Sequence, residues 1–393
     1  MRKKKWITVV LLALIFLWVP APVSAMETDG FRQGAGEDGT FIEEMMGNVD
    51  FAELDGFLER EEFGMREHIS FSELVGQMLE QGLSDFDYSR VIDWLKEVLF
   101  AEVDQNRKLL IEVVLLAVGF SILKNFAGAF SSSYISDLCF LLVYCVLAVM
   151  LLQSFLSFQE IVQGALNDSV EFMKMVIPTY CITMVFSTGS SSSAGFYQTA
   201  FLVIYLVQWL FLNLLIPMIH IYVLMELFNH FFEDEKFANL TELLKGAVCW
   251  GMKIAGIAVL GLNVVQGLVN PAKDRLLNGT IGKAASLIPG VGNTINGVTE
   301  LLLGSGIMIK NCVGAAAVLI LVLISIVPMG KVACMALFYK LAAAVTEPVT
   351  DKRIAGCLKG MAEGGVLYLK LMGYCVVLFF LTIALTTAVS GFL

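Results

Sequence analysis

The sequence predicts an all-α polytopic membrane protein with about eight transmembrane helices, preceded by a signal peptide and a short acidic exported segment. Three observations support this fold class. Hydrophobic residues make up 57% of the 393 residues, and charged residues make up 16%, against about 25% in a typical soluble domain. Several stretches of about 20 residues are almost free of charge, which is the length that a spanning helix needs. Finally, most acidic residues precede these stretches.

The net charge of −10 belongs to one segment of the chain. Residues 26–106 contain 21 acidic and 5 basic residues, whereas residues 107–393 contain 15 acidic and 17 basic residues. Residues 1–25 add the four bases of Arg2-Lys3-Lys4-Lys5. Beyond that tetrad the chain has no basic region of the kind that binds phosphate backbones, so we expect no nucleic-acid partner.

Residues 1–25 have the features of a secretory signal peptide. The four bases precede an apolar run from Trp6 to Val19, and Val23-Ser24-Ala25 supplies small residues at a cleavage site. The apolar run is shorter than a spanning helix, although an uncleaved anchor is the alternative. Either interpretation puts residues 26–106 on the non-cytoplasmic side of the membrane.

The exported segment, residues 26–106, contains two amphipathic helical patterns. Ser70 and Glu73 have capping-box spacing, which predicts the start of a helix. The apolar residues of this helix fall on one side: Phe71, Leu74, Val75 and Met78. A second pattern covers residues 91–99. Two interpretations stay open, namely a docking surface for another exported protein and helices that lie on the membrane.

Hydrophobic stretches from residue 107 onward predict the membrane helices. Residues 107–160 hold the first two, at 109–123 and 138–158. No Asp, Glu, Lys or Arg occurs between Lys174 and Glu226, which leaves room for two more. Further apolar stretches cover residues 247–269, 307–327 and 366–393. Small-residue spacing at Gly256 and Gly261 and at Gly360, Gly364 and Gly365 predicts close contact between helices, within the bundle or between subunits.

The chain is also similar to itself. Pro178 recurs as Pro289 and Pro217 recurs as Pro328, both at an offset of 111 residues. Shorter matches follow in the same order at similar offsets, so we expect a duplication.

The duplication divides the membrane region into two units, residues 161–269 and residues 270–393. Each unit contains three hydrophobic segments. An odd number of crossings would turn the second unit upside down, which predicts an inverted repeat of two three-helix units. With that topology most basic residues fall on the cytoplasmic side, as the positive-inside rule expects.

Residues 284–303 are the unusual part of the second unit. Helix-breaking and polar residues interrupt this apolar stretch: Pro289, Gly290, Gly292 and Glu300. Protein or water must shield such a segment at membrane depth, so a full crossing and a re-entrant loop both stay open. Together with Pro178, Pro217 and Pro328, these residues are candidates for helix breaks or for a transport pathway.

Ionisable residues at membrane depth are the other functional candidates, namely Lys253, Lys310 and Glu300. Lys310 lies near the end of its predicted span, so the favoured interpretation is a side chain that reaches the membrane surface. Lys253 lies deeper in its span. The histidines are far apart and no P-loop occurs, so we expect no catalytic, cofactor or metal site.

Four motifs resemble those of the stage III sporulation protein AE family of endospore-forming bacteria. They are Val265-Gln266-Gly267, Ile288-Pro289-Gly290-Val291-Gly292, Lys310-Asn311-Cys312-Val313-Gly314 and Ala336-Leu337-Phe338-Tyr339-Lys340-Leu341-Ala342-Ala343-Ala344. The resemblance implies a non-enzymatic, multi-pass protein of the mother-cell membrane that surrounds the forespore.

The same resemblance implies a role in the channel or secretion complex that joins the two cells, as a permease-like or scaffold subunit. The implied partners are other stage III A membrane proteins, including an ATPase subunit, and a forespore-side protein of the stage II Q type, besides membrane lipid. The residues alone leave an alternative. An inverted repeat with a broken segment would also suit a free-standing secondary transporter of an unidentified solute.

Overall fold

The computed structural model describes most of the chain from residue 51 onward. The described residues are 51–59, 70–81, 133–188, 190–231, 236–285, 292–348 and 352–389, together with a few isolated positions. The predicted signal peptide, residues 1–25, lies outside them, as does most of the first predicted membrane helix at 109–123.

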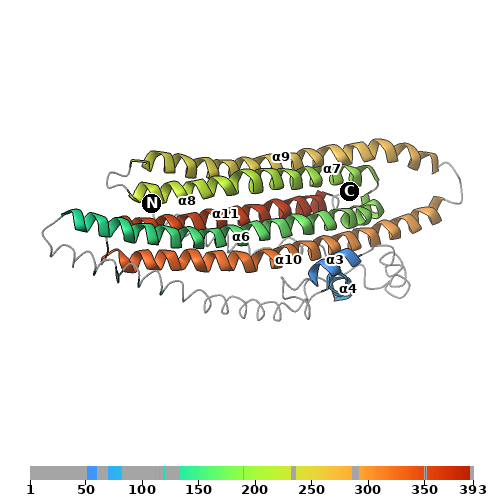
Figure 1. The fold of residues 1–393 in the computed structure, drawn as a ribbon. Coiled ribbons are helices and arrows are strands. Elements are labelled where there is room, and N and C mark those ends of the chain that lie inside the picture. Colours follow the sequence, from blue (N-terminus) through green and yellow to red (C-terminus); the bar gives the residue numbers. More distant parts are fainter. Residues whose placement is uncertain are drawn as a thin grey trace.

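Long helices lie side by side along one axis (Figure 1). Their bounds are α6 Ser133–Thr188, α7 Ser190–Val207, the π-helix η3 Gln208–Leu215, α8 Ile216–Phe231, α9 Ala238–Ala285, α10 Gly292–Thr346 and α11 Lys352–Val389. Because α7, η3 and α8 follow one another without a gap, they form one rod, and the five rods alternate in direction (Figure 1). The described residues contain no strand, which confirms the all-α class.

Five of these helices are long and apolar enough to cross a membrane. The candidate spans are Tyr144–Val185, Ser193–Phe231, Ala238–Val265, Gly304–Thr346 and Lys352–Ala384. At 1.5 Å per residue, the 56 residues of α6 extend over about 84 Å, whereas a hydrocarbon core is about 30 Å thick. A bundle of such helices that crosses a membrane therefore projects well beyond it.

The described helices join predicted spans that the sequence treated as separate. Helix α6 contains both the predicted span 138–158 and the segment around Pro178. Helix α10 begins at Gly292 and continues through 307–327. From residue 138 onward the structure thus has five rods where seven spans were predicted. The charged residues between positions 158 and 176 had suggested a loop between two spans. Charged residues can also lie on the surface of a continuous helix, and α6 continues through this stretch.

The direction of the rods bears on the predicted repeat. Pro217 lies on the α7–α8 rod and Pro328 lies on α10, and these two rods run in the same direction, as do α9 and α11 (Figure 1). The described helices therefore do not show the predicted inversion.

Helices α10 and α11 form the centre of the bundle. In each of them, 56% of the most apolar stretch is buried, against 28% in α6 and α9. Aromatic side chains join the central helices to α6: the rings of Phe155 and Tyr368 stack at 5.3 Å, and those of Phe158 and Tyr339 lie 6.0 Å apart. The Tyr339 hydroxyl donates a hydrogen bond to Ser154 Oγ on α6.

Two short helices, α3 (Ala52–Leu58) and α4 (Phe71–Gln81), pack on the outside of the bundle against α6 and α10 (Figure 1). Helix α4 begins at Phe71, directly after Ser70, where the sequence predicted a helix start, and the four apolar residues predicted to share one side are all buried. The Phe57 and Phe172 rings, 5.9 Å apart, join α3 to α6. The apolar side of α4 therefore packs on its own chain. The second amphipathic pattern, residues 91–99, lies outside the described residues.

Candidate functional site

The candidate residues predicted from the sequence do not gather in one place. Pro178, Pro217 and Lys253 are exposed on three different helices, α6, α8 and α9. Gly292 and Glu300 lie in the N-terminal part of α10. Pro289 and Gly290 lie outside the described residues.

Lys310 corrects a prediction. Its side chain was expected to reach the membrane surface, but Lys310 is completely buried in α10. Next to it, the Oδ1 atom of Asn311 is buried without a hydrogen-bond partner in the described part of the chain. Of the two candidate lysines, Lys253 is the exposed one, on the outer surface of α9 near Trp250 and Ile257, which are also exposed.

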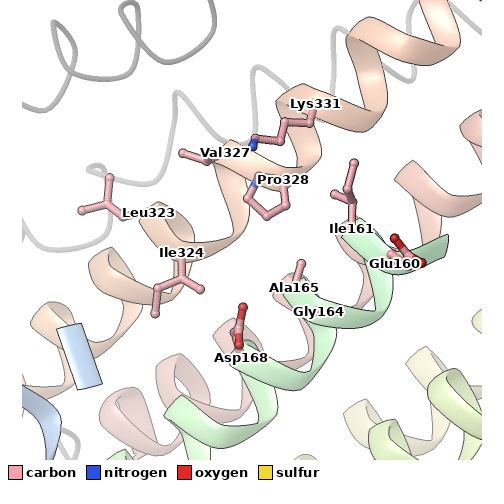
Figure 2. Close-up of a pocket in the computed structure, with 10 residues that line it drawn as sticks. All are labelled: Glu160, Ile161, Gly164, Ala165, Asp168, Leu323, Ile324, Val327, Pro328 and Lys331. Atoms are coloured by element: carbon pink, nitrogen blue, oxygen red, sulfur yellow. The ribbon is translucent and has the colours of Figure 1, made fainter. Parts of the chain in front are cut away.

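A groove of about 220 Å³ lies between α6 and α10 (Figure 2). Its lining residues from α6 are Glu160, Ile161, Gly164, Ala165 and Asp168, and those from α10 are Leu323, Ile324, Val327, Pro328 and Lys331. Among the candidates predicted from the sequence that the structure describes, Pro328 lines this groove.

The groove is lined by acidic and basic side chains, and one of its two helices, α10, contains a proline at this point. Figure 2 shows the Asp168 carboxylate pointing between the two helices and the Pro328 ring facing α6. Proline has no N–H, so the carbonyl oxygen of Ile324 lacks its usual intrahelical donor. Close by, the Oγ atoms of Ser169 and Ser325 lie 3.4 Å apart across the two helices. Such a groove can accommodate water or a small polar solute.

A π-helix is a feature that sequence reasoning missed. Residues Gln208–Leu215 form η3, which ends two residues before Pro217. Its last residue touches α9, since a Cβ atom added to Gly251 would lie 2.9 Å from Leu215 Cδ2. The side-chain oxygen of Gln208 accepts a hydrogen bond from Lys174 Nζ at 3.3 Å. Short π segments often occur at functional positions, and Pro217 was the signal for this one.

A polar junction joins α8, α9 and α11. The Glu363 carboxylate accepts a hydrogen bond from the Tyr222 hydroxyl at 3.1 Å and forms an ion pair with Lys245. Two residues before Tyr222 on α8, His220 Nδ1 lies 2.7 Å from Gln159 Oε1 on α6. Because these partners are far apart in the sequence, no spacing rule could reveal them.

Glycines let α11 approach its neighbours, as their spacing predicted. Gly356, Gly360 and Gly364 recur every four residues on α11. Their surfaces are covered by α8 side chains, respectively His230, Glu226 and Val223. A Cβ atom on Gly365 would lie 2.9 Å from the Ala336 Cβ atom of α10. The close contact predicted at Gly360, Gly364 and Gly365 is therefore confirmed, and it lies within the bundle. At Gly261 an added Cβ atom would meet no atom within 4 Å, and at Gly256 it would lie 3.8 Å from Tyr374 Cε1, so the described residues show no comparably close contact there.

Replacing Pro328 with alanine should stabilise α10 locally. The alanine N–H can donate a hydrogen bond to the Ile324 carbonyl, and loss of the ring removes its steric clash with that carbonyl. Together the two changes should stabilise the helix by up to about 3 kcal/mol. Amide hydrogen exchange of residues 324–332 is the measurement, with slower exchange expected in Pro328→Ala. Pro178→Ala on α6 is the matched control, and its effect should be confined to α6. Faster exchange around residue 328 would contradict the prediction, because it would mean that the ring is needed for packing against α6.

The fold and the sites define a class of protein before any comparison: an all-helical bundle with five candidate membrane-spanning helices and a polar groove between two of them. The described residues contain no group of His, Cys, Asp and Glu side chains that could hold a metal ion.

The chain belongs to the stage III sporulation protein AE family, whose sequence profile matches residues 69–390. It is 27% identical over 295 residues to the stage III sporulation protein AE of Bacillus subtilis (strain 168), which covers 74% of each chain. No solved structure matches the chain. The family match begins just before α4 and includes the groove, the polar junction and the glycines of α11. The family is not known as an enzyme family.

Proposed function

We propose that this chain is a non-enzymatic integral membrane component of the channel or secretion complex between the mother cell and the forespore, and that it acts as a permease-like or scaffold subunit. The observation that carries the proposal is the family match over residues 69–390, which coincides with a bundle of five candidate spans. In the proposal, the protein crosses the mother-cell membrane around the forespore several times.

The exported segment and the partners belong to the same proposal. Residues 26–106, with their predicted signal peptide, lie on the non-cytoplasmic side, where they face a forespore protein of the stage II Q type. The other stage III A membrane proteins surround the bundle, and an ATPase subunit among them supplies the energy, because the sequence contains no P-loop.

Deletion of the gene in the bacterium that carries it tests the proposal. We expect development to stop after engulfment, with a near-complete loss of heat-resistant spores that only the full chain restores. Affinity purification of the full chain from sporulating cells should then recover the ATPase subunit and other stage III A proteins. Normal spore numbers together with a defect in solute uptake would contradict the proposal and favour the free-standing transporter.

A further inference from the structure

Two sides of the bundle differ in chemistry, and the difference suggests what each side faces. The first, here called the acidic side, consists of the outer surfaces of α3 and α4 and of the groove beside them. The second, here called the apolar side, consists of the exposed residues of α7, η3 and α9. The two lie on opposite sides of α11 in Figure 1.

The acidic side carries exposed carboxylates. Glu53 and Glu59 are exposed on α3, and Glu73 is exposed on α4, where its Oε1 accepts a hydrogen bond from Gln77 Nε2 at 3.1 Å. The residues on the inner surfaces of α3 and α4 are apolar. The two helices therefore present carboxylates outward and phenylalanine side chains inward. The neighbouring groove adds Glu160 and Asp168 from α6, together with one base, Lys331 from α10.

The position of α3 and α4 makes these carboxylates informative. Phe57 of α3 packs on Phe172 of α6, and α4 packs on α10. Phe172 belongs to the candidate span Tyr144–Val185, whose 42 residues exceed the length of about 20 that one crossing needs. A carboxylate in contact with lipid tails is strongly disfavoured. An acidic helix pair on a candidate spanning helix is therefore stable only where its outer surface is in water.

The apolar side has the opposite composition. Tyr205 and Trp209 are 68% and 55% exposed, and Trp250 and Ile257 on α9 are 67% and 71% exposed. The sequence contains no Asp, Glu, Lys or Arg between Lys174 and Glu226, which includes all of α7 and η3. Large aromatic and aliphatic side chains exposed in such numbers are costly in water but suit lipid. Lys253 is an exposed charge on this side, and its long side chain can reach the headgroups.

We propose that the apolar side of the bundle faces lipid tails and that the acidic side faces water, so that the protein borders an aqueous space on one flank. The acidic side does not extend along the whole length of the bundle, because apolar residues are exposed elsewhere on the same helices, namely Leu142 on α6 and Leu341 on α10. The inference rests on the membrane location in the proposed function, but it adds an orientation that neither the family match nor the candidate spans contain.

Cysteine labelling tests the orientation in the full chain. The eight native cysteines are first replaced by serine or alanine, and rescue of sporulation shows that this background folds and functions. Glu53→Cys and Glu73→Cys then report on the acidic side, and Tyr205→Cys and Ile257→Cys report on the apolar side. Each variant reacts with a charged maleimide in open membrane fragments, where both membrane surfaces are accessible, and again after denaturation in SDS.

We expect Glu53→Cys and Glu73→Cys to react at least tenfold faster than Tyr205→Cys and Ile257→Cys in membranes, and all four to react alike in SDS. In a second measurement, an apolar diazirine dissolved in the membrane should label peptides from α7 and α9 but not from α3 and α4. Equal labelling rates on both sides in membranes, or diazirine on α3 and α4, would overturn the inference. Absence of the protein from the membrane fraction would instead overturn the proposed function, so the two failures are distinct.

Discussion

Gly365→Ala should destabilise the bundle by about 1–3 kcal/mol, although alanine is the better helix former. A Cβ atom at this position would lie 2.9 Å from Ala336 Cβ and 3.0 Å from Phe158 Cε1. The Ala336 Cβ atom is bonded directly to the α10 backbone and cannot rotate away. The two central helices must therefore separate, and their separation disturbs the contacts of both with α6.

A matched glycine and a compensating substitution make this prediction specific. Gly261 on α9 has no atom within 4 Å of an added Cβ, so Gly261→Ala should leave stability unchanged or raise it. Ala336→Gly removes the opposing methyl group and should restore the stability of Gly365→Ala. Thermal unfolding in detergent, followed by tryptophan fluorescence, is measured for the wild type, Gly365→Ala, Ala336→Gly and the double variant, which gives the coupling between residues 336 and 365, and for Gly261→Ala as the control. A Gly365→Ala protein as stable as Gly261→Ala would show that α10 and α11 are farther apart than described.

The close approach at Gly365 belongs to the part of the fold that the sequence predicted well. Small residues at helical spacing indicate where helices touch, because only they lack the side chain that would prevent it. Charge-free stretches predicted the apolar helices for a similar reason, since a run of 20 apolar residues has few other stable environments. Both signals are local, so one sequence is enough to read them.

The number of helices was harder to predict, because it depends on where the chain turns. Charges near Asp168 looked like a loop between two spans, yet α6 continues through them and places Asp168 beside the groove with α10. Hydropathy cannot distinguish a polar turn from a polar surface patch within a long helix. The predicted inversion depended on the same count of turns, and the described helices do not confirm it.

The candidate site was predicted only in part for a different reason. Pro328 was identified because proline in an apolar helix is conspicuous, and it lines the groove. Lys310 was assigned to the membrane surface from its distance to the end of a predicted span, but the span continues and the side chain is buried. The junction of Tyr222 with Glu363 required tertiary contacts across 141 residues, which no local pattern contains.

Asp55→Ala should release the start of α4 from α3 while the long helices remain folded. The Asp55 carboxylate caps α4 from the neighbouring helix. Its Oδ1 accepts hydrogen bonds from the backbone N–H groups of Phe71 and Ser72 at 2.6 and 3.2 Å, and from Ser70 Oγ at 3.0 Å. Its Oδ2 accepts one from Ser72 Oγ at 2.8 Å. Alanine leaves these donors without the acceptor, at a cost of about 1–3 kcal/mol for a group that water does not fully reach.

Amide hydrogen exchange measured by mass spectrometry can separate this local release from general unfolding. A cost of about 1–3 kcal/mol corresponds to exchange that is roughly 5- to 150-fold faster in residues 71–75. Glu53→Ala is the matched control, because it removes an exposed carboxylate from the same helix and should leave exchange in α4 unchanged. Unchanged exchange in Asp55→Ala would show that the apolar contacts of Phe71 and Val75 hold α4 without its cap. Faster exchange throughout α10 would show instead that the α3–α4 pair supports the whole bundle, since α4 packs directly on that central helix.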